Sequence, residues 1–229
     1  MSMKIGFVVA ISREMIAVFE RFGAPMSEKK VGGGKLYVYQ ADGMEFDVLH
    51  SGIGLISAAA AAVYLVSVEN VDVLVNYGVV GGLTEEAALN RTYVVTKVVH
   101  YNFDVSPIDP VAAGQYPEFP DVYIPVYGGL AKKALSLYPE FHPAISASAD
   151  RFVADAEEKA ALHEKYGADI CDMESAAIAL IAYRHEKPLL MVKTVSDGIA
   201  DGAEGFEREC KSASAKCLDA AIRLLGGVS

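Results

Sequence analysis

The chain has 229 residues, of which 52% are hydrophobic and 22% are charged, and its net charge is −10 with a pI near 5.0. This composition is typical of a folded globular protein, and the length suits one domain spanning residues 1–229. An acidic surface disfavours nucleic acid or an anionic membrane as the main partner, because phosphate groups need Lys and Arg to neutralise them. The charge balance is compatible with a small neutral or zwitterionic ligand.

The apolar runs near the N-terminus and the three cysteines indicate where the protein works. "KIGFVVAI" and "LISAAAAAVYLVSV" are too short to span a membrane, and no cleavage-site pattern follows the first. The cysteines are odd in number and form no CxxC motif, and Cys210 and Cys217 would lie roughly 10 Å apart on one helix, too far to bridge. The sequence therefore predicts a cytoplasmic protein without disulfides.

Strands and helices are expected to alternate along the chain. Segments rich in β-branched residues predict strands at 5–11, 71–78, 92–99 and 188–195, several of them apolar enough to be buried on both faces. Helices are expected at about 12–22, 56–68, 127–138, 156–166, 172–185 and 203–226. "KLYVYQADGMEFDVLHSG" predicts a hairpin that turns at Asp42-Gly43. The alternation indicates an α/β fold with a mixed, mostly parallel sheet.

One long segment breaks this pattern. Residues 101–126, "YNFDVSPIDPVAAGQYPEFPDVYIPV", are rich in Pro and aromatic residues and show no periodicity. Unstructured loops of this length in a compact domain usually serve function or form an interface.

Three clusters follow predicted strands and could share a site. Glu14 follows the first strand, the glycine-rich turn "NYGVVGGL" follows the strand at 71–76, and Ser196-Asp197 follows the strand at 188–195. In open α/β sheets ligands bind beyond the carboxyl ends of the strands, so Glu14 and Asp197 are expected on one rim.

Each cluster also has a purely structural interpretation. Glu14 could complement a helix dipole, Asp197 could be a helix cap, and "GVVGG" could be a tight turn without a ligand. As a phosphate loop that turn lacks the spacing and the Lys of a P-loop.

The stretch "DICDMESAAIALIAYRHEKPLLMVKTVSDGIAD" carries more information. If 172–184 is a helix, Asp172 is a plausible N-cap, whereas Glu174 heads an apolar stripe and must be half-buried. A half-buried carboxylate needs partners such as backbone N–H groups or ligand hydroxyls. Met173 could equally be a core residue. The five histidines show no metal-ligand spacing, so no metal site and no cofactor are predicted.

Taken together, these motifs resemble those of the nucleoside phosphorylase family, and most closely its hydrolytic branch, which cleaves 5′-methylthioadenosine and S-adenosylhomocysteine. The similarity runs over nearly the whole chain in the same order. It is carried by "MKIGFVVAISREM", "LHSGIGLISAAAAA", "VNYGVVGGL", "GQYP", "SADRFV", "CDMESAAIA" and "TVSDGIAD". The resemblance implies a three-layer nucleoside phosphorylase-like fold with a central mixed, mostly parallel sheet flanked by helices.

The resemblance also implies roles for individual residues. Asp197 would donate a proton to purine N7 with support from Ser196, Glu174 would bind the ribose hydroxyls, and Glu14 would activate the attacking water. The residues implied in substrate binding are Phe152 and Val153 at the base, Met173 below the sugar, Ile53 and Phe206 in the 5′ pocket, and Gly78 and Val79 in the glycine-rich turn. Pro117 and Ile108 would reach the 5′ site of a neighbouring subunit, which implies a homodimer or a larger homo-oligomer.

The chemistry suits these residue types, because cleavage of a ribosyl C–N bond leaves positive charge on the sugar and negative charge on the base. Asn76 and Val79 stand where the family's phosphorylases carry an Arg and a hydroxyl, and their loss favours water over phosphate as the nucleophile. The sequence therefore predicts a hydrolase that releases adenine from a 5′-modified adenine nucleoside. A phosphate-dependent purine nucleoside phosphorylase, a futalosine-type hydrolase and a non-catalytic nucleoside binder remain as alternatives.

Overall fold

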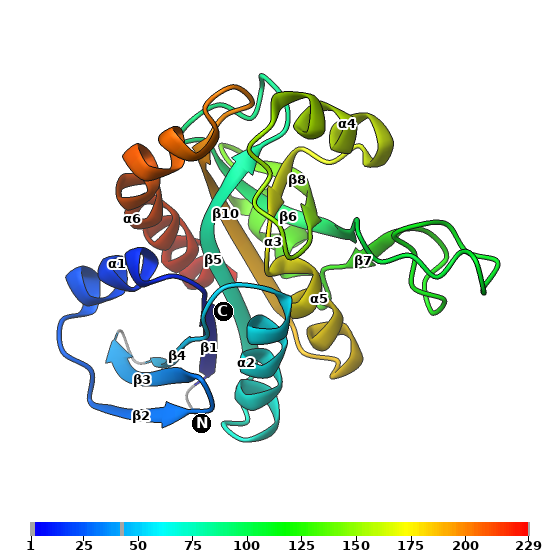
Figure 1. The fold of residues 1–229 in the computed structure, drawn as a ribbon. Coiled ribbons are helices and arrows are strands. Elements are labelled where there is room, and N and C mark those ends of the chain that lie inside the picture. The colour runs from blue at the N-terminus through cyan, green and yellow to red at the C-terminus, as the bar shows by residue number, and fades with distance from the viewer. Residues whose placement is uncertain (1–2, 42–43, 229) are drawn as a thin grey trace.

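A computed structural model describes residues 3–41 and 44–228, which form a mixed β-sheet between helices (Figure 1). The strands are β1 (Lys4–Val9), β2 (Ser27–Val31), β3 (Gly34–Ala41), β4 (Met44–His50), β5 (Val73–Gly82), β6 (Thr92–His100), β7 (Tyr123–Pro125), β8 (His142–Ser148), β9 (Ile170–Asp172) and β10 (Leu189–Asp197). The helices are α1 (Ser12–Phe22), α2 (Leu55–Ser67), α3 (Leu130–Leu137), α4 (Ala156–Tyr166), α5 (Ser175–Arg184) and α6 (Gly202–Val228).

The strand pairing places four parallel strands side by side. β10, β5, β1 and β4 pair in parallel in that order, and β3 and β2 add an antiparallel edge beyond β4. β5 also pairs with β9, and β9, β8, β6 and β10 pair in turn, so these five strands close into a ring. The carboxyl ends of β1, β5 and β10 therefore meet at one edge of the sheet.

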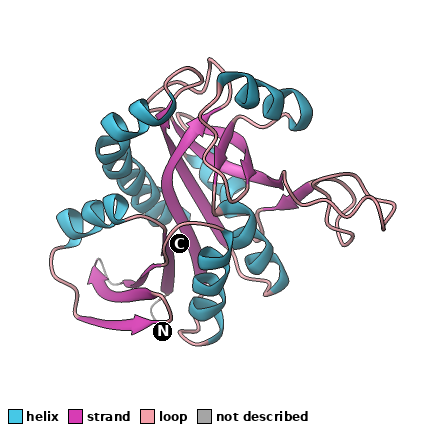
Figure 2. Cartoon of the chain, viewed as in Figure 1, coloured by secondary structure: helices cyan, strands magenta, loops and turns pink. Residues whose placement is uncertain are grey.

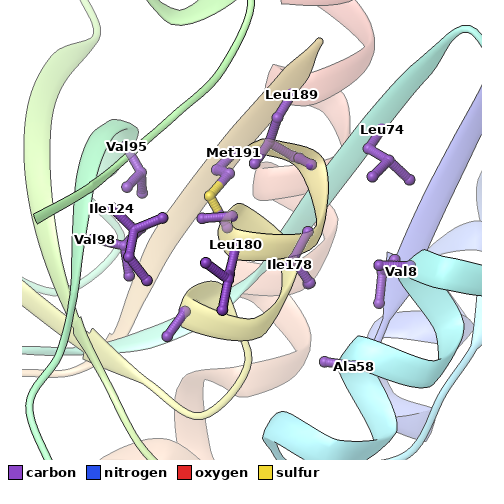
Figure 3. Packing of buried hydrophobic residues seen from close by; sticks show 14 of the residues in the cluster. Val8, Ala58, Leu74, Val95, Val98, Ile124, Ile178, Leu180, Leu189 and Met191 are labelled. Atoms are coloured by element: carbon purple, nitrogen blue, oxygen red, sulfur yellow. The ribbon is translucent and has the colours of Figure 1, made fainter. Parts of the chain in front are cut away.

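Helices cover both faces of the sheet, as Figure 2 shows in cyan against magenta strands. α1, α3 and α6 pack on one face, while α2 and α5 pack together on the other. On the α5 side, Leu74 of β5 and Met191 of β10 pack against Ile178 and Leu180 (Figure 3). Because both faces are covered, β10 is buried along its whole length, as the apolar run 188–195 predicted.

The predicted α/β class, a mixed sheet flanked by helices, is confirmed. The helices predicted at 12–22, 56–68 and 156–166 form within one residue of those bounds, and the other three form with shifted ends. The hairpin predicted around Asp42-Gly43 forms from β3 and β4, while the turn itself lies outside the described residues. Four strands were not predicted, namely β2, β7, β8 and β9.

Two local predictions were wrong. The segment read as a glycine-rich turn, "NYGVVGGL", is a continuation of strand β5 to Gly82, because β10 pairs alongside it as far as Gly81. Asp172 is not the N-cap of α5, because that helix begins at Ser175 and Glu174 holds the N-cap position. Asp172 instead ends strand β9, which pairs with β8.

The long segment between β6 and β7 projects from the body of the molecule (Figure 1). The segment 101–126 is irregular as predicted, except that residues 123–125 form strand β7. The rings of Phe103 and Tyr116 stack within it with centroids 4.1 Å apart. Among the described residues, no helix combines the length and the apolar character needed to cross a membrane.

Candidate active site

A cavity of about 280 Å³ opens at the edge where the carboxyl ends of β1, β5 and β10 meet. Its lining includes three predicted catalytic residues, Glu14, Glu174 and Asp197. The prediction that Glu14 and Asp197 lie on one rim is therefore confirmed. The size suits a small molecule rather than a polymer.

Most of the predicted binding residues also line this cavity. They are Ile53, Val79, Phe152, Val153, Met173, Ser196 and Phe206. Gly78 lies one residue outside it, where a side chain would collide with the Glu14 carboxylate. Pro117 and Ile108 are exposed in the projecting segment and do not line the cavity of their own chain.

Glu14 is held by backbone amides at the junction of β1 and α1. Its Oε2 accepts hydrogen bonds of 3.3 Å from the N–H groups of Ala10 and Ile11, and its Oε1 accepts one of 3.0 Å from Val79. The carboxyl group is buried, and burial raises its pKa despite those amides and the nearby charge of Lys193. The helix-terminus role considered from the sequence is thus real, but the same group also faces the cavity.

Glu174 lies just before α5 and accepts a hydrogen bond from a backbone amide that is distant in sequence. Its Oε1 accepts a 2.9 Å hydrogen bond from the N–H of Gly54, whose φ of +97° is a conformation that favours glycine. Burial, followed by the charge of Asp172, raises the pKa of Glu174 to about 7. The side chain is buried rather than half-buried as predicted, and the raised pKa favours its protonated form below about pH 7.

Asp172 and Lys193 form a buried ion pair whose charges act on Glu174. The Lys193 Nζ lies 2.7 Å from Asp172 Oδ2, and each side chain is only 2% exposed. Although burial opposes it, the charge of Lys193 together with hydrogen bonds from Ser175 and Ser148 lowers the pKa of Asp172. Sequence analysis missed Lys193, although a lysine inside the apolar run "PLLMVKTV" was a signal that a buried partner exists.

Asp197 has a donor on each carboxylate oxygen. Ser196 donates its hydroxyl to Oδ1 at 3.0 Å, and Lys159 of α4 donates to Oδ2 at 2.8 Å. Burial raises the pKa of Asp197, while Lys159 and Ser196 act in the opposite direction. Lys159 was also missed, because "AEEKAALHEKY" is rich in charge and nothing in it marks one lysine as buried.

Aromatic side chains form the outer wall of the cavity. The rings of Phe152 and Phe206 meet edge to face with centroids 5.7 Å apart. The Arg13 guanidinium lies 5.5 Å from the Phe206 ring centre and pairs with Glu207. Arg151, beside Phe152, lines the cavity and pairs with Glu158 at 2.9 Å. These rings give the cavity an apolar aromatic wall that suits a planar ring.

Comparisons with known proteins agree with this architecture. The family model of the phosphorylase superfamily matches residues 4–225, so the chain belongs to that superfamily. It is 28% identical to a 5′-methylthioadenosine/S-adenosylhomocysteine nucleosidase of Haemophilus ducreyi, covering 100% of both chains. It is 26% identical to an aminodeoxyfutalosine nucleosidase of Helicobacter pylori, covering 96% of this chain and 98% of the relative.

The fold has close counterparts among solved structures. The Helicobacter pylori 5′-methylthioadenosine/S-adenosylhomocysteine nucleosidase bound to butyl-thio-DADMe-Immucillin-A superposes with a TM-score of 0.90. Its sequence is 23% identical, and the match covers 98% of each chain. The resemblance identified in the sequence is thereby confirmed for family and fold.

The raised pKa of Glu174 yields a prediction about stability. An unfolded Glu loses its proton near pH 4.5, whereas folded Glu174 keeps it to about 7, so between these values the folded state binds more protons and stability falls as pH rises. Glu174→Gln removes this cost and should stabilise the protein at pH 8 by on the order of 3 kcal/mol, but not at pH 4.5. Urea unfolding at both pH values measures the difference.

Glu164→Gln, an exposed change on α4, is the control and should leave the pH dependence of unfolding unaltered. An equal stability change for Glu174→Gln at both pH values would show that Glu174 is not protonated in the folded protein.

Proposed function

We propose that this protein hydrolyses the N-glycosidic bond of a 5′-modified adenine nucleoside, of the 5′-methylthioadenosine or S-adenosylhomocysteine type, and releases adenine. The observation that carries the proposal is the convergence of Glu14, Glu174 and Asp197 on one aromatic-walled cavity. The names of the relatives in Haemophilus and Helicobacter support the same reaction class.

Asp197 acts as the general acid in this proposal. A protonated carboxyl group donates to N7 of the base, so that adenine departs as a neutral leaving group. Its other oxygen accepts from the 6-amino group, which favours adenine over 6-oxo purines. Burial supports this role, because it raises the pKa of Asp197 and favours the protonated form. Ser196 holds the carboxyl through Oδ1.

Glu174 binds the 2′- and 3′-hydroxyls of the ribose, and Met173 packs below the sugar ring. When the hydroxyls donate to Glu174, its charge is stabilised and it counters the positive charge that builds on the ribosyl ring. Phe152 stacks on the base, and the backbone of Val153 hydrogen-bonds to it. All four residues line the cavity.

Glu14 serves the nucleophile. Its carboxyl group is fixed by three backbone amides and faces the cavity, so it can orient a water molecule and take its proton. Burial raises its pKa, which makes it a stronger base than an exposed Glu. A base of this kind is needed for water attack on the sugar carbon.

The same contacts argue against a phosphorylase. The Val79 amide, in the segment where the family's phosphorylases hold phosphate, already donates to Glu14, and a carboxylate there repels a phosphate dianion. Asn76 is buried and donates its amide to the Val8 carbonyl at 3.1 Å, so it offers no cation to the cavity. Arg13 is paired with Glu207, and Arg91 donates to the Glu86 carbonyl.

The 5′ substituent lies toward Ile53 and Phe206, and Pro117 and Ile108 extend to the 5′ site of a neighbouring subunit. Ile53 is 58% exposed and Ile108 is 86% exposed, as expected of apolar residues that a second copy covers in a homodimer. The enzyme works in the cytoplasm. A futalosine-type nucleoside is a second candidate substrate, supported by the aminodeoxyfutalosine nucleosidase among the relatives.

The deciding assay follows adenine release from 5′-methylthioadenosine with and without millimolar phosphate, and identifies the sugar product. We expect phosphate-independent release with free methylthioribose. Formation of a sugar 1-phosphate would make the protein a phosphorylase instead. Absence of release from 5′-methylthioadenosine, S-adenosylhomocysteine and a futalosine-type nucleoside would overturn the hydrolase proposal.

Asp197→Asn should lower kcat for adenine release by about 10²–10⁴-fold, because the amide cannot supply the proton. The measurement is steady-state kinetics, with thermal unfolding to establish that the variant is folded. Asp219→Asn, an exposed acid on α6, is the matched control and should keep wild-type rates. A near wild-type rate for Asp197→Asn would remove this residue as the acid.

Glu14→Gln should lower kcat by about 10²-fold or more with little change in KM, because the base acts on the nucleophile rather than on the bound nucleoside. Glu20→Gln on the same helix has an exposed side chain and serves as the control. If Glu14→Gln raised KM alone, the side chain would belong to substrate binding and not to water activation.

A further inference from the structure

Helix α4 carries a lysine that is fully buried. The Lys159 side chain is 0% exposed, and it shares the buried face of α4 with Leu162 and Tyr166. Its Nζ donates to Asp197 Oδ2 at 2.8 Å and to the Gly198 carbonyl at 2.7 Å. Burying an ammonium group costs free energy unless it is paired and hydrogen-bonded, so its placement against one particular carboxylate needs an explanation.

We propose that Lys159 is a positioning residue for the general acid: it aims the carboxyl group of Asp197 and determines which of its oxygens carries the proton. The inference rests on the proposed function, since it assigns a role in the same proton transfer. It adds a residue from a different element of the fold, outside the wall of the cavity.

The two oxygens of Asp197 have different neighbours. Oδ2 faces an ammonium group, which can only donate. Oδ1 faces the Ser196 hydroxyl, which can donate or accept and which also reaches the Val80 carbonyl at 3.3 Å. When Asp197 is protonated, the Ser196 hydroxyl can donate to the Val80 carbonyl instead of to Oδ1. The proton of the acid can then reside on Oδ1. Lys159 thus makes Oδ1 the donor oxygen.

Close packing keeps the ammonium group in place. A side chain at position 81 would lie 2.9 Å from Cys171 Sγ, 3.1 Å from Asp197 Oδ2 and 3.6 Å from Lys159 Nζ, so only glycine leaves room there. Helix α4 begins three residues after Val153, which is proposed to contact the base. Asp155 caps the helix by accepting a 2.9 Å hydrogen bond from the Glu158 amide. Helix α4 therefore follows Phe152 and Val153 closely in the chain and contacts Asp197 through Lys159.

Lys159 also offsets the effect of burial on acidity. Burial raises the pKa of Asp197, and the charge of Asp201 adds to it, while Lys159 and Ser196 lower it. Cys171, whose own pKa is raised to about 12 by burial, stays a neutral thiol beside the pair. A buried carboxyl without a cation would hold its proton too tightly to release it, and a general acid works best with a pKa near the working pH.

Lys159→Met tests this role, with Lys165→Met as the matched control because Lys165 is exposed on the same helix. For Lys159→Met we expect kcat for adenine release to fall about 10- to 100-fold with little change in KM. Activity requires the protonated acid, so it falls at alkaline pH. Loss of the cation raises the pKa of Asp197, so the alkaline limb of kcat/KM should move up by about one pH unit or more.

Lys159→Gln separates aiming from charge and serves if Lys159→Met is not recovered folded. Its amide can still donate to Oδ2, so kcat should recover partly while the alkaline limb stays shifted. An alkaline limb that coincides with that of wild type in the folded variant would overturn the inference and leave a structural ion pair. A wild-type enzyme that releases no base from any nucleoside tested would instead overturn the proposed function itself.

Discussion

The proton affinities of the acids in the site depend on the free-energy cost of burying charge. Four carboxylates are buried at or beside the cavity, those of Glu14, Asp172, Glu174 and Asp197. The ammonium group of Lys193 pairs with Asp172, and that of Lys159 pairs with Asp197. Burial raises the pKa of Glu14, Glu174 and Asp197, and the charge of Asp172 raises that of Glu174 further. These shifts favour the protonated forms of the three acids, and the proposed mechanism requires a protonated acid at Asp197.

The two lysines divide the four acids into different roles. Lys193 lies against Asp172 and lowers the pKa of that acid, while burial, followed by the charge of Asp172, raises the pKa of Glu174 to about 7. Lys159 lies against Asp197 and moderates the effect of burial there. Glu14 accepts hydrogen bonds from backbone amides, and burial raises its pKa although these amides and the charge of Lys193 oppose the shift. Similar side chains thus acquire different proton affinities from their burial and their partners.

Much of this arrangement could be predicted from the sequence. Apolar β-branched runs identified β1, β5, β6 and β10, and the rule that ligands bind beyond parallel strand ends placed Glu14 and Asp197 together. The short strands β7 and β9, of three residues each, carry too little periodicity to be recognised. Residues 78–82 were misread because glycines are typical of turns, whereas here they let β5 continue where Glu14, Cys171 and Ala87 approach its backbone closely.

The lysines were beyond the reach of local pattern. Lys159 lies in a helix whose other charges are exposed, and only the packing of α4 against the end of β10 reveals its partner, 38 residues away along the chain. This pairing depends on tertiary structure, because no spacing rule links a residue in helix α4 to the end of strand β10. The positions that sequence reasoning missed are therefore those that set the proton affinities of the acids it found, because proton affinity is decided by burial and by neighbours distant in sequence.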